Sequence, residues 1–406
     1  MKLEAYLRTV FHRGSLEVVM PGGRRMVLGD GSEPRVVVRL RDRATVGRIA
    51  ARPGLALGEA YMAGALEFEF GTIAELLELA SMNGGRRPDR RPASPMTRWW
   101  LDQTRQRNAR SAARRNVAHH YDLSVDLYRL FLDRDLQYSC ALFEEPGVSL
   151  DEAQAAKKRH IAAKLLLEPG QRVLDIGCGW GGMALTLAAA ADVRVDGITL
   201  STEQLATART RADAMGLAGK AHFELTDYRD VTGTYDRIVS VGMFEHVGPA
   251  NYQTFFNKVA DLLTDDGIAL IHSIGRSGPS STTDPWTTKY IFPGAHLPSL
   301  SEVFPAVERA GLWVTDMEIL RLHYASTLAH WRLRFMANRD EAAALFDERF
   351  CRMWEYYLAA AEMGFRHGGH MNFQLQLSKR VDAVPLTRGY IEEAERALCD
   401  EGRSAA

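Results

Sequence analysis

The stretch Val173-Leu-Asp-Ile-Gly-Cys-Gly-Trp-Gly-Gly182 decides the fold of this chain. Its first residues are apolar, as in a buried strand, and four of its last six positions are glycine. An apolar helical pattern follows directly at Met183, Leu185 and Leu187. A strand, a glycine turn and a helix in this order open a nucleotide-binding α/β domain, because glycines let the backbone come close to a ligand.

The glycines alone leave the kind of ligand open. Gly177, Gly179 and Gly182 satisfy the spacing of a dinucleotide site, but such a site needs an acidic residue at the end of the second strand. That strand, predicted over 193–198, runs into Thr199-Leu200 and has no carboxylate at its end. Asp175 would repel a pyrophosphate and could pair with a cationic ligand. The pattern D-x-G-C-G-x-G resembles motif I of S-adenosylmethionine-dependent methyltransferases, and glycines that only pack a helix on a strand are the alternative.

Composition and charge narrow the class of protein. The chain has 406 residues, 46% hydrophobic and 25% charged, which is typical of a globular protein with more than one domain. No apolar run approaches the roughly 20 residues of a membrane span, and the first residues lack the apolar core of a signal peptide. The four cysteines show no CxxC or zinc-ligand spacing, so we expect no metal site and a reducing cytoplasm.

Residues 1–81 are predicted to form a small α+β domain. Two strands, over 16–20 and 35–40, are separated by the turn signals Pro21-Gly-Gly23 and Gly29-Asp-Gly31. Residues 45–80 show the apolar spacing of short helices. Nothing here has a catalytic pattern, so we expect a packing or dimerising module, with lipid contact as the alternative.

The stretch over 82–115 is predicted to be a basic linker. It contains ten arginines against two aspartates from Arg86 to Arg115, in a chain whose net charge is −1. Trp99 and Trp100 lie inside it. Basic residues and tryptophan favour the surface of an anionic bilayer. A solvated helix with inward tryptophans is the alternative, and no nucleic-acid-binding fold is recognisable.

A catalytic domain is predicted over 116–390, with a C-terminal tail over 391–406. Its strands are expected at 172–176, 193–198, 221–225, from 235, at 268–274 and around 371–377. This pattern predicts a Rossmann-like, mostly parallel sheet with helices on both faces. Ligands of such sheets bind beyond the carboxyl ends of the strands. Glu245 and His272 both fall there, and Tyr138-Ser-Cys140 could form a lid over the cofactor.

Three further segments carry local signals. Ser201-Thr-Glu-Gln204 has the form of a capping box, although Gln204 could instead reach ribose hydroxyls. Residues 275–300 form a long insertion of the kind that is usually functional. Helices are expected to begin near residue 322 and to run on from Phe346. His119 and His120 lie at the start of the domain and fit capping or core positions.

Six ordered motifs make the resemblance specific. They are His120-Tyr-Asp-Leu-Ser, Tyr138-Ser-Cys-Ala, Leu174-Asp-Ile-Gly-Cys-Gly-Trp-Gly, Gly197-Ile-Thr-Leu-Ser, Phe244-Glu-His-Val-Gly and Tyr290-Ile-Phe-Pro-Gly. Together they resemble the cyclopropane-fatty-acyl-phospholipid synthase and mycolic acid cyclopropane synthase family of methyltransferases, over about residues 116–380. The resemblance implies a class I methyltransferase fold with a seven-stranded sheet.

The family implies a mechanism with definite chemical needs. An alkene in a phospholipid acyl chain attacks the sulfonium methyl of S-adenosylmethionine, and a base removes a proton from the transferred carbon as the ring closes. In this family a bound bicarbonate is the base. The residues that match its binding set are Cys140, Glu245, His272, Ile274 and Tyr324. By resemblance, Tyr290, Phe292 and Trp331 are candidates to line the acyl channel, with core packing as the alternative.

The cofactor positions carried over from the motifs are Tyr138, Ser139, Asp175, Gly177, Gly179, Thr199, Gln204 and Tyr228. One departure concerns a cysteine that several members have in a late helix. Here the aligned position, in Tyr356-Tyr-Leu-Ala-Ala-Ala361, is alanine, which weakens a thiol nucleophile and leaves the bicarbonate mechanism intact.

Three alternatives stay open at this point. The same cation can give a methylene or methyl branch. The family also resembles small-molecule N-methyltransferases, and a catalytically silent lipid-binding protein is the third possibility. The expected partner is unsaturated phospholipid at the inner face of the membrane, touched peripherally by a cytoplasmic protein, with no nucleic acid and a possible homodimer.

Overall fold

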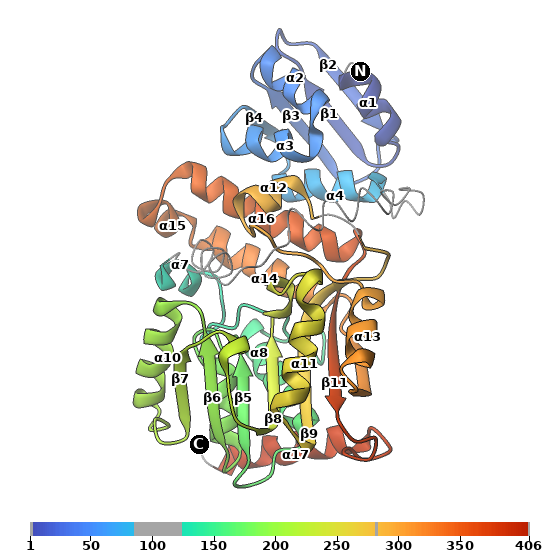
Figure 1. Ribbon diagram of the computed structural model, residues 1–406. Helices are drawn as coiled ribbons and strands as arrows, with labels where there is room; N and C mark the ends of the chain where they lie inside the picture. The colour runs from blue at the N-terminus through green and yellow to red at the C-terminus, as the bar shows by residue number, and fades with distance from the viewer. Residues whose placement is uncertain (1–2, 85–123, 281–282, 405–406) are drawn as a thin grey trace. The chain divides into compact units, whose positions relative to one another are not determined.

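The computed structural model describes residues 3–84, 124–280 and 283–404, with side chains as far as residue 399. The predicted linker beyond residue 84 and the His119-His120 pair lie outside the described residues. The chain divides into two compact units (Figure 1). Among the residues described, no helix combines the length and the apolar character needed to cross a membrane.

The first unit contains a four-stranded sheet in the order β2-β1-β3-β4. Its strands are β1 (Ser15–Val19), β2 (Arg25–Gly29), β3 (Arg35–Leu40) and β4 (Leu66–Phe70). β1 and β3 confirm the two predicted strands. The prediction of helix throughout 45–80 was wrong at β4, because alternating Leu-Glu-Phe-Glu-Phe pairs with β3. The early helices are α1 (Leu3–Val10), α2 (Arg43–Ala51), α3 (Pro53–Met62) and α4 (Ile73–Gly84).

Two later segments, 283–293 and 324–370, belong to the same unit as residues 3–84. They supply α12 (Pro285–Tyr290), α14 (His323–Ala337), α15 (Arg339–Leu345) and α16 (Glu348–Arg366). α14 and α16 confirm the two helices expected there. Tyr61 of α3 donates a 2.6 Å hydrogen bond to Glu355 of α16, and Lys289 of α12 pairs with Glu59 of α3 at 2.7 Å. The N-terminal residues therefore pack with a helix inside the predicted insertion, α12, and with a helix that follows it, α16.

The second unit contains the seven-stranded sheet, in the order β10-β11-β9-β8-β5-β6-β7. Its strands are β5 (Arg172–Ile176), β6 (Arg194–Thr199), β7 (Ala221–Leu225), β8 (Tyr235–Val241), β9 (Leu263–Arg276), β10 (Trp313–Ile319) and β11 (His370–Ser378). β5 to β9 pair in parallel, and β10 pairs with β11 in antiparallel orientation. The predicted mostly parallel sheet is confirmed.

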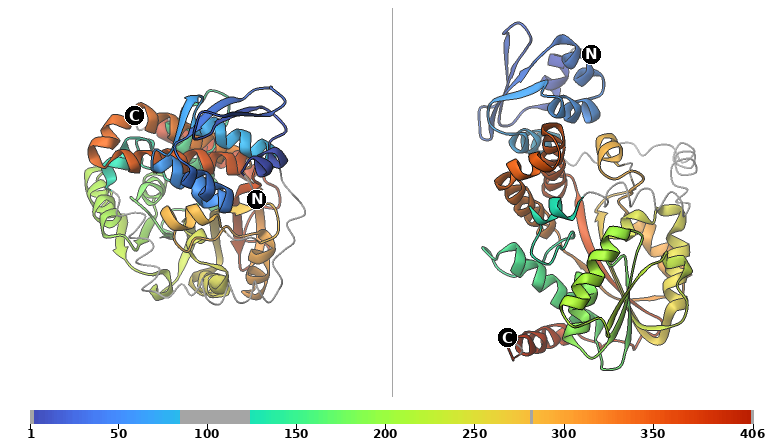
Figure 2. Two further views of the ribbon diagram at one scale, coloured as in Figure 1. Left: turned by 90° about the horizontal axis from the view of Figure 1, so that it is seen from above. Right: turned by 90° about the vertical axis from the view of Figure 1, so that its left-hand side faces the viewer.

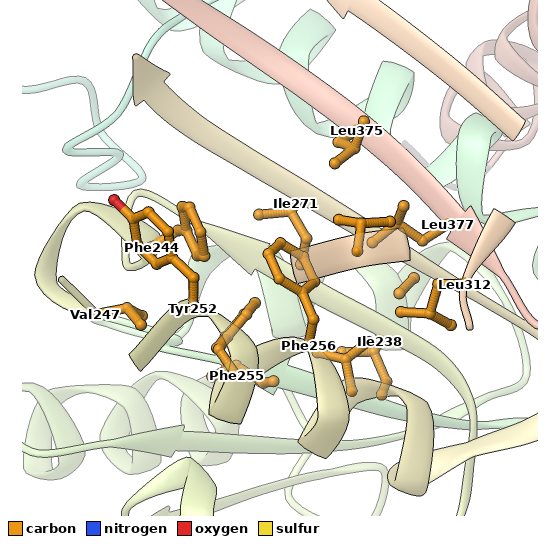
Figure 3. Close-up of a cluster of buried hydrophobic side chains, with 14 of the residues drawn as sticks. Ile238, Phe244, Val247, Tyr252, Phe255, Phe256, Ile271, Leu312, Leu375 and Leu377 are labelled. Carbon is orange, nitrogen blue, oxygen red and sulfur yellow. The ribbon is translucent and has the colours of Figure 1, made fainter. Parts of the chain in front are cut away.

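Helices cover both faces of this sheet (Figure 2). The helices α8 (Leu150–Leu165), α9 (Gly182–Ala190) and α10 (Thr202–Ala214) contribute to one buried apolar cluster, and α17 (Gly389–Ser404) packs on α8. The opposite face is covered by α11 (Tyr252–Leu262) and α13 (Leu300–Arg309). Figure 3 shows this second cluster, in which Phe255 and Phe256 of α11 pack with side chains of the sheet.

Candidate active site

The candidate site lies beyond the carboxyl ends of β5, β6, β8 and β9. Strand order reverses between β5 and β8, because the chain runs from β5 to β6 on one side and later returns to β8 on the other. A reversal of this kind leaves a crevice where ligands of open α/β sheets bind. The glycine motif follows β5, and Glu245 follows the end of β8. His272 lies within β9, opposite Val241, which is the last residue of β8.

Three glycines of the motif, Gly177, Gly179 and Gly181, serve two different purposes. A Cβ atom on Gly177 would come 2.7 Å from Met243, and one on Gly181 would come 2.9 Å from the ring of Phe223. Gly179 has φ +55°, and its Cβ would meet no described atom within 4 Å. Gly177 and Gly181 are therefore needed for packing, whereas Gly179 borders open space of the kind a cofactor needs.

Asp175 is buried at the end of β5. Burial raises the pKa of Asp175 to about 7, opposed by a hydrogen bond from the backbone of Ala184. Its Oδ2 has no hydrogen-bond partner among the described residues. A buried carboxyl oxygen without a partner is costly, so this atom marks a place where a polar or cationic ligand group fits.

Ser201 and Gln204 form only half of the predicted capping box. The Ser201 hydroxyl accepts a hydrogen bond from the backbone N–H of Gln204 at 3.3 Å and so caps α10. The side chain of Gln204 does not return to the cap, because its Oε1 accepts from the hydroxyl of Thr199 at 2.8 Å. Thr199 and Gln204 are thus joined to each other at the end of β6.

The segment around Tyr138 is held by polar side chains of α8. Lys157 donates to the hydroxyl of Ser139 at 2.9 Å, and Gln154 donates to its carbonyl at 2.9 Å. Burial lowers the pKa of Lys157 to about 8. Cys140 is fully buried, and the ring of Tyr138 packs edge-on against Tyr128 at 5.3 Å. These contacts fix the segment that the motifs assign to cofactor and anion binding.

Tyr228 begins a short 3-10 helix, η1 (Tyr228–Asp230), after β7. Its ring lies 5.3 Å from that of Phe255, and burial raises the pKa of Tyr228 to about 12. Asp227 anchors the turn because it caps η1 and pairs with Arg229 at 2.6 Å. An apolar aromatic wall on a fixed turn suits the cofactor contact that the motifs assign to Tyr228.

Glu245 lies on η2 (Phe244–His246), directly after β8. The neighbouring Phe244 anchors this turn, because its ring stacks on Tyr252 at 4.6 Å inside the cluster of Figure 3. Oε1 of Glu245 accepts from the backbone N–H of Ile274 at 2.6 Å. Burial raises the pKa of Glu245 to about 7 against that hydrogen bond, so the carboxyl changes charge near neutrality.

His272 is completely buried on β9 and stands opposite Val241 of β8. Burial lowers the pKa of His272 well below its usual range, and the nearby charges of Lys157, Lys164 and His160 lower it further. Nε2 of His272 and Oε2 of Glu245 both lack a protein partner within the described ranges. We call Glu245 and His272 the strand-exit pair. Sequence reasoning missed Gln374, which contacts His272 from β11.

The remaining predicted site residues belong to the first unit, and their contacts are given within that unit. Tyr324 of α14 packs at 4.7 Å on Phe365 and edge-on against Trp331. Tyr290 donates to Glu59 at 2.9 Å, and Phe292 packs on Tyr357. Each aromatic ring thus has packing partners within its unit, and roles in anion binding or an acyl channel stay predictions.

Comparison with known proteins identifies the family. The sequence model described as mycolic acid cyclopropane synthetase matches residues 108–375, and one described as a domain of unknown function matches residues 3–86. The cyclopropane-fatty-acyl-phospholipid synthase of Escherichia coli K12 is 43% identical over 263 residues, which is 65% of this chain and 67% of that protein.

Two further relatives extend the match. A tuberculostearic acid methyltransferase of Mycobacterium tuberculosis is 38% identical over 380 residues, covering 89% of this chain and 87% of its own. The crystal structure of a mycolic acid cyclopropane synthase complexed with SAH and CTAB superposes with a TM-score of 0.61 at 35% identity. It covers 65% of this chain and 97% of that one. The chain therefore belongs to the mycolic acid cyclopropane synthetase family and is an S-adenosylmethionine-dependent methyltransferase.

Proposed function

We propose that this chain transfers the methyl carbon of S-adenosylmethionine to the double bond of an unsaturated phospholipid acyl chain and closes a cyclopropane ring, with bound bicarbonate as the base. The observation that carries the proposal is the strand-exit pair. Two buried polar atoms have no protein partner among the described residues: Oε2 of Glu245, just after β8, and Nε2 of His272, on β9 opposite the last residue of β8. The Escherichia coli relative bears the name of this activity.

The residues at the ends of β5 and β6 fit S-adenosylmethionine. This cofactor supplies an electrophilic methyl group on a sulfonium centre. Asp175 offers an unpartnered carboxyl oxygen to its cationic part, and Gly179 leaves room for its backbone contacts. Gln204 and Thr199 stand where the ribose hydroxyls fall by resemblance, and Tyr228 offers a ring face to adenine.

The strand-exit pair fits bicarbonate. This anion supplies a base that works in an apolar pocket. A small anion with one O–H needs both acceptors and donors around it. Glu245 accepts a hydrogen bond in its ionised form, and its pKa of about 7 keeps that form available near neutrality. His272 is buried and neutral, so it can donate without adding a charge. The backbone at Cys140 completes the proposed set within this unit, and a role for the hydroxyl of Tyr324 is proposed from the family resemblance alone.

A second candidate product is a methyl-branched or methylene-branched chain. The tuberculostearic acid methyltransferase relative matches 89% of this chain, including part of the N-terminal region. The same cofactor residues and the same strand-exit pair would serve that product, because the two reactions diverge only after methyl transfer. Product analysis, rather than the site, distinguishes them.

The membrane is the expected location of the substrate. A phospholipid acyl chain is reached only by an enzyme that touches a bilayer, and the arginine-rich linker with Trp99 and Trp100 is suited to an anionic surface. We therefore propose peripheral contact at the inner face of the membrane. Binding to anionic vesicles is expected to weaken as salt rises. Vesicle binding that does not change with salt concentration would exclude the electrostatic contact and support attachment through apolar side chains alone.

The test uses purified protein, S-adenosylmethionine and vesicles of mono-unsaturated phospholipid. Fatty acids are then analysed by mass spectrometry and proton NMR. A gain of one CH₂ group with upfield ring protons supports the cyclopropane product. The same mass with vinylidene protons indicates a methylene branch, and a gain of CH₂ plus two hydrogens indicates a saturated methyl branch. No transfer to lipid with cofactor binding intact would contradict the proposal.

Glu245→Gln provides the matched variant. It keeps the shape of the side chain and removes its ionised form. We expect turnover to fall at least about tenfold, or about 1.4 kcal/mol of transition-state stabilisation, while cofactor binding survives. Unchanged turnover would remove Glu245 from the mechanism.

A further inference from the structure

A chain of buried side chains leads from His272 through the second unit. Nδ1 of His272 lies 3.3 Å from Nε2 of Gln374 on β11. Oε1 of Gln374 accepts a 2.9 Å hydrogen bond from Nζ of Lys164 on α8. All three side chains are at most 1% exposed. Lys164 also contacts the carboxylates of Glu318 and Asp316, the latter at 3.4 Å.

The chemistry of the groups fixes the direction of each hydrogen bond. A lysine ammonium group has three N–H donors and no acceptor, so the Gln374 amide must turn its oxygen toward Lys164. The amide nitrogen then faces His272. An amide NH₂ group only donates as well, so Nδ1 of His272 must accept and carries no proton.

The remaining nitrogen of His272 therefore holds the ring proton. A neutral imidazole has one N–H, and burial together with three nearby cationic side chains keeps this ring neutral. The proton is then on Nε2. This atom is buried and has no acceptor in the part of the chain that the structure describes. It is a hydrogen-bond donor on β9, opposite the last residue of β8, the strand that leads to Glu245.

We propose that Gln374 and Lys164 are positioning residues that hold His272 as the neutral tautomer with its proton on Nε2, so that His272 donates a hydrogen bond to the anion at the strand-exit pair. The identity of that anion rests on the proposed function. The other two states of the ring would fail there. A tautomer with the proton on Nδ1 would turn a lone pair toward the anion, and an imidazolium would give the anion a proton and remove the base.

The tautomer can be measured without any turnover. Protein enriched with ¹⁵N-histidine gives long-range ¹H–¹⁵N correlations that separate protonated from unprotonated ring nitrogens. The chain has 12 histidines, and comparison with His272→Asn assigns the ring in question. We expect His272 at neutral pH to show a protonated Nε2 and an unprotonated Nδ1. A protonated Nδ1, or a doubly protonated ring, would overturn the proposal even if cyclopropane forms. The expected tautomer in a protein that makes no cyclopropane would leave the inference standing and remove the proposed function.

Gln374→Glu tests the control of the tautomer directly. The new carboxylate can still pair with Lys164, but it accepts rather than donates toward Nδ1. We expect the ring proton to move to Nδ1 and kcat to fall about 10- to 100-fold with the KM for S-adenosylmethionine unchanged, as for other residues that orient a functional histidine. A wild-type spectrum and wild-type kcat in this variant would contradict the role of Gln374.

Gln376→Glu is the matched control. Gln376 lies two residues along β11, is equally buried, and bonds the Lys164 carbonyl at 2.6 Å, Tyr390 at 2.8 Å and Thr315 at 2.8 Å. This variant should keep Nε2 of His272 protonated. A proton moved to Nδ1 by both variants would show that any charge on β11 has the effect, against a specific role for Gln374. If neither variant folds, the wild-type spectrum alone decides the inference.

Discussion

Two buried polar regions of the second unit differ in how their charges are partnered. The α8 network consists of His160, Lys164, Glu318 and Glu395. In it His160 lies between Glu318 at 2.7 Å and Glu395 at 2.6 Å, and Lys164 contacts Glu318. The strand-exit pair is buried like His160 and Lys164, yet one polar atom of each of its side chains lacks a partner among described residues. Burial alone therefore does not distinguish a structural region from a functional one.

The difference shows where the fold is stabilised and where it is kept ready for a ligand. Buried charges that have partners hold elements together, and removal of one partner leaves the other charge buried and uncompensated. Buried polar atoms without partners cost free energy, and they persist at functional sites because a ligand completes them. Opposite effects of mutation on stability in the two regions follow from this contrast.

The largest effect on stability is expected for Lys164→Met. This change removes the Lys164 cation from Glu318 and Asp316, which keep His160 and Arg388 as partners, and it leaves Oε1 of Gln374 buried without this donor. We expect the free energy of unfolding to fall by about 3 kcal/mol. Urea unfolding measures it. The control is Lys220→Met, which removes an exposed pair with Asp192 and should change stability by less than about 1 kcal/mol. Equal effects of the two variants would contradict the structural role of the α8 network.

Glu245→Gln should act in the opposite direction. The folded protein raises the pKa of Glu245 from 4.5 to about 7, so the folded state holds a proton that the unfolded state has already released. Stability is therefore lost as pH rises between these values. The variant should be more stable than wild type by on the order of 3 kcal/mol above about pH 8, and equal to it near pH 4. Urea unfolding at a series of pH values measures this difference in the free energy of unfolding. A difference that stays constant across pH would contradict the prediction.

Glycine replacements separate packing from cofactor contact within the motif. In Gly181→Ala the new Cβ atom would clash with the Phe223 ring, and the backbone there has φ +84°, which disfavours alanine. This variant should lose about 1–3 kcal/mol of stability. Gly179→Ala, at φ +55° in open space, should cost about 1–2 kcal/mol and also weaken S-adenosylmethionine binding about tenfold. Calorimetric titration and thermal unfolding test both. Unchanged cofactor affinity in Gly179→Ala would place the cofactor elsewhere.

The smallest effect is expected for Ser201→Ala. Loss of the helix cap should lower stability by about 1 kcal/mol without changing cofactor affinity, because Gln204 bonds Thr199 rather than the cap. Thr202→Ala, one position on and exposed, serves as the control. A lower affinity for the cofactor in Ser201→Ala would show that the helix cap contributes to cofactor binding and would contradict this prediction.

Local signals in the sequence were enough to predict the sheet and the motif residues. β5 is a short apolar run before glycines, Glu245 follows a predicted strand, and His272 lies near the end of the strand predicted at 268–274. β11 shows where this reasoning stopped. The alternation of Met371, Phe373 and Leu375 predicted a strand, and the polar residues of an alternating strand commonly face water. Both faces of β11 are in fact buried, so Gln374 was passed over.

The set of segments that forms the first unit could not be predicted from the sequence, and the reason is different. Contacts such as Tyr61 with Glu355 join residues almost 300 positions apart, at a separation of 294, and neither residue has a local pattern that announces the partner. The α8 network has the same character, because Lys164, Glu318 and Glu395 come from three distant segments. Polar pairs between residues far apart in the sequence can be identified only once the fold is known.

The most direct test of the central claim is the dependence of turnover on bicarbonate. Methyl transfer to unsaturated phospholipid vesicles is measured in buffer freed of carbon dioxide, and again after bicarbonate is added back. We predict that turnover falls on removal and returns on addition in the wild type, that S-adenosylmethionine binding stays constant, and that Glu245→Gln shows little response. Full turnover without bicarbonate, unchanged by its addition, would contradict the assignment of the strand-exit pair as the site of the base.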